Sequence, residues 1–231
     1  MKCLLSVSLT AALAVVAELA MSNLLQSPPL QKGISVQMAV TNNAVAMPEA
    51  DNENAWIVAL TADGQLYFGT HAVSLDSLTE EMKATPRNRG QKLYIKADAR
   101  APFASVEKVL EAGRQVWFEA PVLLTSQRGP AEPGNIVPPK GLEVLVGALP
   151  SAESIVVQIS KSDQVSPRLT VNGAEVSDAG FASTLQQMLS SRSEKSVVLK
   201  ADGELPFAQV VRVVDMCRSR GVKVVVDGPE I

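Results

Sequence analysis

One segment of this sequence occurs twice, and the repetition limits the folds that the chain can adopt. Leu93–Asp98 reads as a short apolar strand ending on Lys-Ala-Asp, and Val197–Asp202 repeats this pattern. Each copy is followed at the same distance by Pro-Phe-Ala, starting at Pro102 and at Pro206, where a helical pattern opens. The two copies lie 104 residues apart throughout this stretch. Because repetition at a fixed spacing encodes a repeated structural unit, we expect the chain to contain one fold twice.

The first unit is predicted to have the order β-β-α-β-α-β. Asp63-Gly64 between two apolar runs is a strong hairpin signal, and Ser74 is a suitable cap for the helix that follows. Pro121 indicates a bulge or an edge position in the last strand. The predicted elements are Trp56–Leu60, Gln65–Phe68, Leu75–Met82, Leu93–Ala97, Phe103–Leu110 and Val116–Leu124.

The second unit repeats this order, with Asn172-Gly173 as a turn and Gly221 closing the last helix. Its predicted elements are Ile155–Ile159, Arg168–Val171, Phe181–Leu189, Val197–Ala201, Val210–Cys217 and Val222–Val226, and Leu142–Val146 is a further strand that feeds into it. The predicted class is α+β: two tandem domains, each a small mixed sheet with two helices on one face, after an N-terminal apolar helix.

The boundaries between these parts follow from composition. Residues 1–25 form a membrane anchor or signal segment, and residues 26–54 form an extended spacer in which Ile34–Met38 is a candidate edge strand. The first domain then covers residues 55–125. Residues 126–141 are rich in Pro and Gly and therefore form a semi-rigid linker. The second domain covers residues 142–231.

The N-terminal apolar run, Cys3–Leu25, has two interpretations. After the basic Lys2, it fits a cleaved secretory signal. About 20 apolar residues are also enough to span a bilayer, so it equally fits an uncleaved anchor whose C-terminal side faces outward. Glu18 lies within this run, and an acid at membrane depth is a candidate proton-linked group unless it reaches the interface. In both interpretations the remainder of the chain is exported.

Composition excludes several classes of function. The net charge of −3 does not indicate a nucleic-acid surface. A single histidine, His71, argues against His-rich metal sites and triad chemistry, and it is expected in a loop after the hairpin. Of the two cysteines, Cys3 lies in the apolar run, which leaves Cys217 as a small buried residue. We therefore expect no cofactor, no metal and no enzymatic activity.

Asp98 and Asp202 are the candidate catalytic residues of the sequence. A carboxylate at the C-terminal end of a strand is where α/β folds place function. The alternative is structural, in which each acid caps the turn or the helix that begins with Pro-Phe. Neither copy has a partner acid or base at a related spacing, so the structural interpretation is favoured.

The order of motifs resembles the ExbD/TolR family of biopolymer-transport proteins. The resemblance is carried by the hairpin around Asp63-Gly64, the strand ending on Lys96-Ala97-Asp98, and the helix Phe103–Gly113. Leu30–Gly33 and Thr41–Asn43 resemble the family's segment between membrane helix and domain. The likeness covers residues 1–125 and, more loosely, 150–231 as a second copy.

The resemblance implies a non-enzymatic part of an ion-driven motor in the cell inner membrane. Such proteins are single-pass, with the C-terminal domain in the periplasm, and they work beside an ExbB/TolQ-like membrane protein. The domain dimerises and contacts a TonB-like protein or peptidoglycan, and Asp98, Asp202, Phe103 and Phe207 are the candidate partner-binding residues. The family's membrane aspartate would fall near Ala14, so proton coupling would depend on Glu18.

Two functions from different classes follow. The first is an ExbD/TolR-like accessory protein of a transport complex driven by the proton-motive force. The second is a cleaved, soluble periplasmic binding protein without a motor role, and an enzyme using Asp98 or Asp202 is a third, weaker alternative. The tandem further predicts that the two copies pack as an intrachain pseudo-dimer that imitates the family's homodimer, or that the chain forms homodimers itself.

Overall fold

The computed structural model of the chain describes residues 34–88, 90–127, 138–147, 154–162 and 166–227. The predicted segment 1–25, Glu18 included, and most of the Pro/Gly-rich linker lie outside these ranges. Within them, no helix has the length and apolar character that crossing a bilayer requires.

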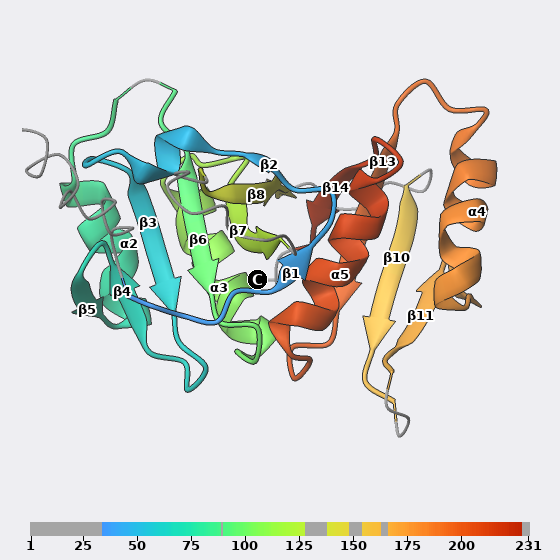
Figure 1. Ribbon diagram of the computed structural model, residues 1–231, viewed down its shortest axis with the longest axis horizontal. Helices are drawn as coiled ribbons and strands as arrows, with labels where there is room; N and C mark the ends of the chain where they lie inside the picture. Colours follow the sequence, from blue (N-terminus) through green and yellow to red (C-terminus); the bar gives the residue numbers. More distant parts are fainter. Residues whose placement is uncertain (1–33, 89, 128–137, 148–153, 163–165, 228–231) are drawn as a thin grey trace, which may run out of the picture. The chain divides into compact units, whose positions relative to one another are not determined.

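The first repeat contains the predicted order of elements with short strands added to it (Figure 1). Thr61, Asp63 and Gln65 close the predicted hairpin, whose strands pair antiparallel. Ser74 caps its helix as predicted, in a reciprocal capping box with Ser77. The elements are β1 (Val40–Thr41), β2 (Val45–Ala46), η1 (Pro48–Asp51), β3 (Trp56–Leu60), β4 (Leu66–Phe68), β5 (His71–Val73), α2 (Leu75–Ala84), β6 (Leu93–Ala97), α3 (Phe103–Gln115) and β7 (Val122–Gln127).

The second repeat has the same order, again with short additional strands. Asn172 and Gly173 both have positive φ, as a two-residue hairpin turn requires. The elements are β8 (Lys140–Glu143), β9 (Leu145–Val146), β10 (Ile155–Ser160), β11 (Arg168–Val171), β12 (Ala174–Glu175), α4 (Asp178–Leu189), β13 (Ser196–Ala201), α5 (Phe207–Arg218) and β14 (Lys223–Val226). The α+β class with mixed sheets is confirmed.

Each repeat has a sheet with a parallel centre. Antiparallel strands flank this centre on both sides in the first sheet and on the β11–β12 side alone in the second, where β9 continues the parallel pairing. The strand order is β2-β8-β7-β6-β3-β4-β5 in the first sheet, where β1 also pairs with β7, and β12-β11-β10-β13-β14-β9 in the second. β3, β6 and β7 run parallel, as do β10, β13 and β14. Helices therefore connect the central strands, since a parallel pair needs a crossover connection.

Three local predictions differ from the structure. His71 lies in β5, which adds a strand to the hairpin, and not in a loop. Ile34–Met38 forms no strand, although Met38 makes a single bridge to Asp98. The last strand of the first repeat begins at Val122 and not at Val116, because the chain first makes a turn with Trp117 at φ 67°.

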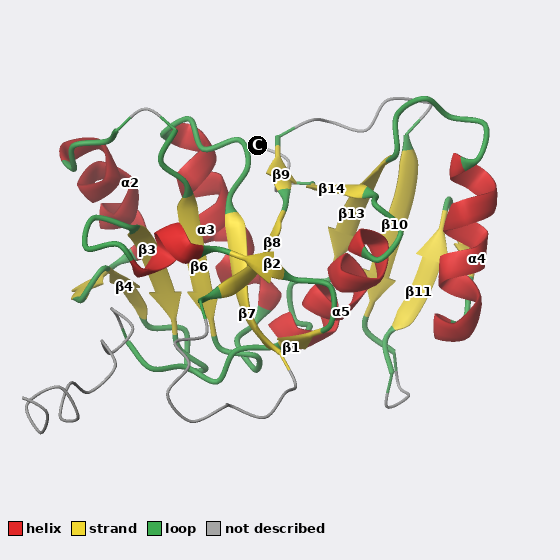
Figure 2. Cartoon of the chain, turned by 45° about the horizontal axis from the view of Figure 1, so that its top comes forward, coloured by secondary structure: helices red, strands yellow, loops and turns green. Residues whose placement is uncertain are grey.

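The predicted strand Leu142–Val146 is divided between the two sheets. β8 pairs antiparallel with β7, and Val144 and Val146 extend this contact by donating to the carbonyls of Pro121 and Glu119. β9 also pairs in parallel with β14 of the second repeat. One continuous stretch of chain thus joins the two sheets edge to edge (Figure 2).

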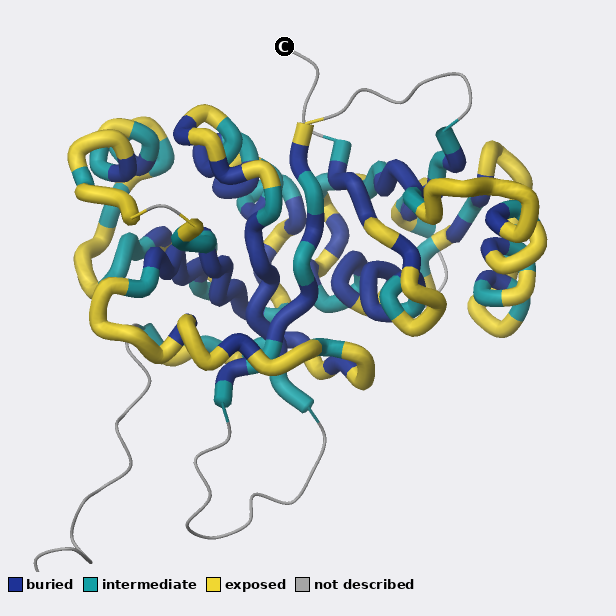
Figure 3. Tube along the Cα trace, turned by 90° about the horizontal axis from the view of Figure 1, so that it is seen from above, coloured by how far each residue is buried: buried dark blue, intermediate teal, exposed yellow. Residues whose placement is uncertain are grey.

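The core follows the alternation of the strands. In β3, Trp56, Val58 and Leu60 pack with α2 and α3, while Ile57 faces a smaller apolar cluster with Met47 and Ala50 around η1. In β10 only one face is buried, and Gln158 on the other face is exposed. The main cluster contains residues of both repeats, and buried stretches of chain run through the middle of the molecule (Figure 3). The two repeats therefore share one hydrophobic core.

Candidate functional site

The two copies of Pro-Phe-Ala meet each other. Phe103 N–H donates to the carbonyl of Leu205 at 2.9 Å, and Phe207 N–H donates to the carbonyl of Ala101 at 2.8 Å. Ala104 N–H donates to the carbonyl of Gly203 at 3.0 Å, and Ala208 N–H donates to that of Ala99 at 2.9 Å. Exchanging the two repeats converts each bond into its counterpart, and Pro102 and Pro206 form a bridge between them. We call these four bonds the junction ladder.

The junction ladder supplies hydrogen-bond acceptors for the first N–H groups of α3 and α5. The first N–H groups of a helix have no partner within the helix. The caps of α3 and α5 are Pro102 and Pro206, which make no side-chain capping bond. The loop of the opposite repeat supplies the missing acceptors. The start of each helix is therefore complete only when the two repeats are together, which is the arrangement expected of a pseudo-dimer.

Phe103 and Phe207 are buried at this junction, with exposed fractions of 2% and 0%. Each is the first residue of its helix, and each belongs to the shared core. Their side chains therefore contact the interior of this chain and leave no surface for a separate partner in this conformation.

Asp98 is a turn acid at the edge of the junction. Its carboxylate accepts bonds from the N–H groups of Gln37 and Arg100 and from the Arg100 guanidinium, at 2.8 to 3.1 Å. It does not cap α3, whose cap is Pro102, so of the two structural roles considered, helix cap and turn acid, it has the second. The Arg100 guanidinium lowers the pKa of Asp98 to about 2, against the opposing effect of burial. A carboxyl held ionised in this way is a poor proton acceptor.

Asp202 is in the equivalent turn but has fewer contacts. It accepts a bond from the N–H of Glu204 at 3.1 Å, and Asp202 itself is exposed. No arginine follows it, since Gly203 stands where the first repeat has Ala99 and Glu204 where it has Arg100. The structure therefore brings the two repeated loops together but gives their acids different roles.

This difference gives a matched test. We expect Asp98→Ala to lower the free energy of unfolding by about 2 kcal/mol, because it leaves the Gln37 N–H and the Arg100 guanidinium without their acceptor. Asp202→Ala, the control at the repeated position, is expected to cost less than about 1 kcal/mol. Urea unfolding of the two variants measures both values. Equal losses would contradict the structural role assigned to Asp98.

The segment before the first sheet crosses from one repeat to the other. We define Gln37–Asn43 as the crossing segment. It contacts Asp98 at its start, and its Thr41 hydroxyl lies 2.7 Å from the Thr125 hydroxyl. At its end, the N–H groups of Asn42 and Asn43 donate to the Asp215 carboxylate of α5 at 3.0 and 2.8 Å. Asp215 is 7% exposed.

β9 makes the reciprocal crossing from the second repeat. It packs against α3, and Gly147 directly after it lies so close to Arg114 that a Cβ there would be 2.8 Å from the Arg114 Cδ. Gly147 also has φ 107°, so both the space and the backbone favour glycine. Glu111, which corresponds to Asp215 in the repeat, binds Arg114. Each repeat thus extends a segment over the other repeat's last helix.

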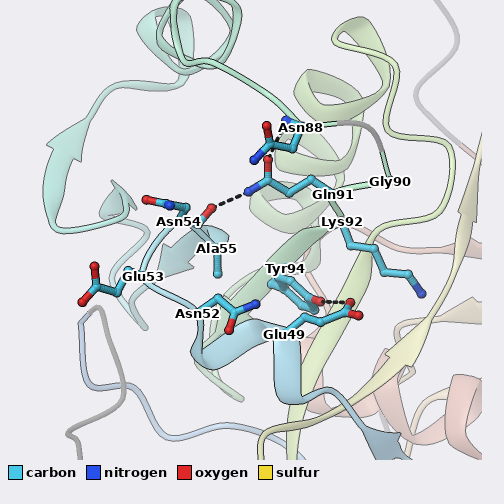
Figure 4. Close-up of a pocket in the computed structure, with 10 residues that line it drawn as sticks. All are labelled: Glu49, Asn52, Glu53, Asn54, Ala55, Asn88, Gly90, Gln91, Lys92 and Tyr94. Carbon is cyan, nitrogen blue, oxygen red and sulfur yellow. Dashed lines mark hydrogen bonds between the residues drawn. The ribbon is translucent and has the colours of Figure 1, made fainter.

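A polar pocket of about 420 Å³ lies where β3 and β6 begin (Figure 4). The Tyr94 hydroxyl lies 3.5 Å from a Glu49 carboxylate oxygen. Gln91 donates from its side chain to the carbonyl of Asn54 and accepts from the N–H of Asn88. Sequence reasoning did not identify this pocket, because its residues come from two separate stretches, 49–55 and 88–94, and share no motif. It is lined by Glu49, Asn52, Glu53, Asn54, Ala55, Asn88, Gly90, Gln91, Lys92 and Tyr94.

The described residues offer no catalytic constellation. Cys217 is fully buried, and burial raises the pKa of its thiol to about 12, so it stays protonated and inaccessible. Among these residues no three His, Cys, Asp or Glu side chains are grouped so as to hold a metal ion. The features that do stand out are the buried junction, the pocket, and the exposed apolar residues Val40, Val45 and Trp117.

The comparison with known proteins agrees with the repeat. The family model for biopolymer transport protein ExbD/TolR matches residues 12–128 and again residues 122–226. No curated protein and no solved structure matches the chain. Because these two matches together cover most of the sequence, the chain belongs to the ExbD/TolR family of biopolymer transport proteins and contains the family's domain in two copies.

Proposed function

We propose that this protein is an accessory component of an envelope transport complex driven by the proton-motive force. It works through contacts of its two domains in the periplasm, with another protein or with peptidoglycan. The observation that carries this proposal is the double match to the ExbD/TolR model. The junction ladder supports it, because one chain here contains the two-copy arrangement that the family is expected to form by dimerisation.

In this proposal residues 1–25 are a single-pass anchor in the cell inner membrane. The anchor places the domains on the periplasmic side and brings them next to an ExbB/TolQ-like membrane protein. Glu18 is then the only acid in the apolar run and the candidate for any proton-linked step, since position 14 is an alanine. The accessory role in transport is the family's, whereas the single-pass anchor, the ExbB/TolQ-like neighbour and the role of Glu18 are what we propose for this chain.

A TonB-like partner would bind by adding a strand to an open edge of a sheet. β5 is such an edge, because it pairs with β4 on one side and is the last strand in the order. Its residues His71 and Ala72 are exposed. Of the four residues first considered for partner contact, Asp202 lies on the exposed side of its turn, whereas Asp98, Phe103 and Phe207 support the junction.

Co-purification tests the proposal directly. The full chain is tagged at its C-terminus, extracted from membranes in mild detergent and captured. We expect an ExbB/TolQ-like membrane protein to be recovered with it, and Glu18→Ala to leave the amount recovered unchanged while impairing transport. A chain that stays in the membrane fraction but recovers no such protein would contradict the proposal.

The alternative is a cleaved, soluble periplasmic binding protein that kept the domains and has no motor role. The described pocket around Tyr94 favours this second function, because it offers amide and carboxylate groups to a polar ligand. N-terminal sequencing of the mature protein distinguishes the two. A mature chain that begins near Glu18 or Met21 excludes the anchor, and one that retains the apolar run excludes the cleaved form.

A further inference from the structure

Two acids from different repeats occupy positions that are apolar in the other copy. Glu107 of α3 corresponds to Val211 of α5, which is fully buried. The pairing of β14 with β13 aligns Val226 with Leu123, and hence the following Asp227 with Leu124, which is 5% exposed. Both positions therefore hold buried apolar side chains in one repeat and an acid in the other, Glu107 in α3 and Asp227 after β14.

Glu107 lies one helical turn beyond the junction ladder. It is four residues after Phe103 and three after Ala104, so the three residues share one face of α3. Ala104 contacts the second repeat directly, since a Cβ at Gly203 would lie 2.9 Å from the Ala104 Cβ. This face of α3 therefore points toward the second repeat. β9 packs against α3 and pairs with β14, which places Asp227, directly after β14, near this helix, and its charge acts on Glu107.

The other charged groups near this contact are already engaged or are exposed. Lys200 of β13 forms an ion pair with Asp227 at 2.7 Å. On α3, Glu111 binds Arg114, and Lys108 is exposed, as is Lys223 on β14. Among the described residues no hydrogen bond or ion pair is made to the Glu107 carboxyl. Half-burial and the negative charge of Asp227 raise the pKa of Glu107 to about 7.

We propose that Glu107 and Asp227 make the junction between the two repeats sensitive to pH. Protonated Glu107 lies against the second repeat without repulsion from Asp227. Ionised Glu107 brings a second, partly desolvated negative charge to the same place, and this favours separation of the repeats. A partner that releases protons near the domain would then tighten the junction, a consequence that rests on the proposed function.

The direction of the effect follows from proton linkage. The pKa of Glu107 is higher in the folded protein than the ordinary 4.5, so between pH 4.5 and about 7 the closed junction binds more protons than the separated one. The closed form is therefore favoured at low pH and loses stability as the pH rises to about 7, above which the loss is complete. Each unit of this range corresponds to a tenfold change in the closed–open equilibrium.

Amide hydrogen exchange of the junction ladder measures this equilibrium. The probes are the N–H groups of Phe103, Ala104, Phe207 and Ala208, with rates corrected for the intrinsic effect of pH. From pH 5 to pH 8 we expect their protection factors to fall roughly a hundredfold in the wild-type chain. In Glu107→Gln, which is neutral at every pH, the fall should be less than about threefold. Parallel falls in both proteins would overturn the proposal.

Carbon-13 titration of the Glu107 carboxyl separates coupling across the junction from simple burial. We expect a midpoint near 7 in the wild-type chain and a lower midpoint in Asp227→Asn, which removes the neighbouring charge. The control is Glu194→Gln, which removes a charge from an exposed loop and should leave both the midpoint and the protection factors unchanged. A wild-type midpoint near 4.5 would overturn the proposal, and this measurement does not depend on any variant. A midpoint that is unchanged in Asp227→Asn would overturn it as well.

Discussion

Phe207→Ala is expected to lower the free energy of unfolding by about 3–5 kcal/mol, the usual cost of emptying a large aromatic site in a core. Phe207 has no exposed surface and lies where the cores of the two repeats meet. The expected loss is therefore not confined to the second repeat. Phe103→Ala, at the repeated position, should produce a loss of similar size.

The tryptophans make this coupling measurable. The chain has two, Trp56 and Trp117, and both lie in the first repeat. If the shared core unfolds as one unit, Phe207→Ala will shift the urea midpoint seen by tryptophan fluorescence as far as the midpoint seen by far-UV circular dichroism. Val45→Ala, at a half-exposed strand position, is the control and should change stability by less than about 0.5 kcal/mol. A fluorescence midpoint unmoved by Phe207→Ala would mean that the repeats unfold independently.

Asp215→Ala is expected to cost about 3 kcal/mol and to release the end of the crossing segment. The carboxylate is almost fully buried and accepts the N–H groups of Asn42 and Asn43, two donors that would be left unpaired in a partly buried place. Hydrogen bonds to a charged group contribute about 1.5–3 kcal/mol each, and they are only partly replaced by water after truncation.

The repeat again provides the control. Glu111 stands at the corresponding position of α3 but binds Arg114 on its own helix, and that arginine is 39% exposed. Glu111→Ala should therefore cost less than about 1 kcal/mol. Hydrogen exchange locates the effect: the amides of Asn42 and Asn43 should lose protection in Asp215→Ala and keep it in Glu111→Ala. Retained protection in Asp215→Ala would show that other contacts hold the crossing segment.

The sequence predicted correctly those elements that are set by residues close together in the chain. The hairpin at Asp63-Gly64, the capping box at Ser74 and the turn at Asn172-Gly173 are set by residues within a few positions of one another. The helices and central strands follow from apolar periodicity, which neighbouring side chains determine. These parts of the fold could be predicted because their causes lie within the same short stretch of chain.

The prediction was wrong where one apolar pattern was compatible with both a strand and a turn. Val116 and Phe118 are apolar and alternate like a strand, but both are buried around the turn that ends α3. Trp117 takes φ 67° there, and Gly221 takes φ 68° at the repeated position. A glycine would have indicated this turn, whereas tryptophan rarely adopts a left-handed conformation and so gave no signal. The strand consequently begins six residues later than the apolar run does.

Contacts between residues far apart in the chain are not marked by any sequence motif. The pocket around Tyr94 and the pair Glu107 and Asp227, in which one charge acts on the other, assemble from residues far apart in the chain. The partners of Asp98 show the same limit: Arg100 lies two residues away, but Gln37 comes from the segment that had been interpreted as a spacer. Which residues meet in this way depends on how the two repeats pack.

From the sequence alone, the doubled Lys-Ala-Asp and Pro-Phe-Ala segments indicated that one fold occurs twice. Apolar periodicity and turn residues gave the order of its elements, and these motifs together with the Asp63-Gly64 hairpin carried the resemblance to the family. Only the tertiary structure decided that the two copies complete each other, with each helix start capped by the other repeat's loop and each repeat crossing over its neighbour. The physical reason is that periodicity and turn residues act over a few positions. The first N–H groups of α3 and α5 find their acceptors in the loop of the other repeat, 99 to 109 residues away in the chain, and no local pattern specifies that partner.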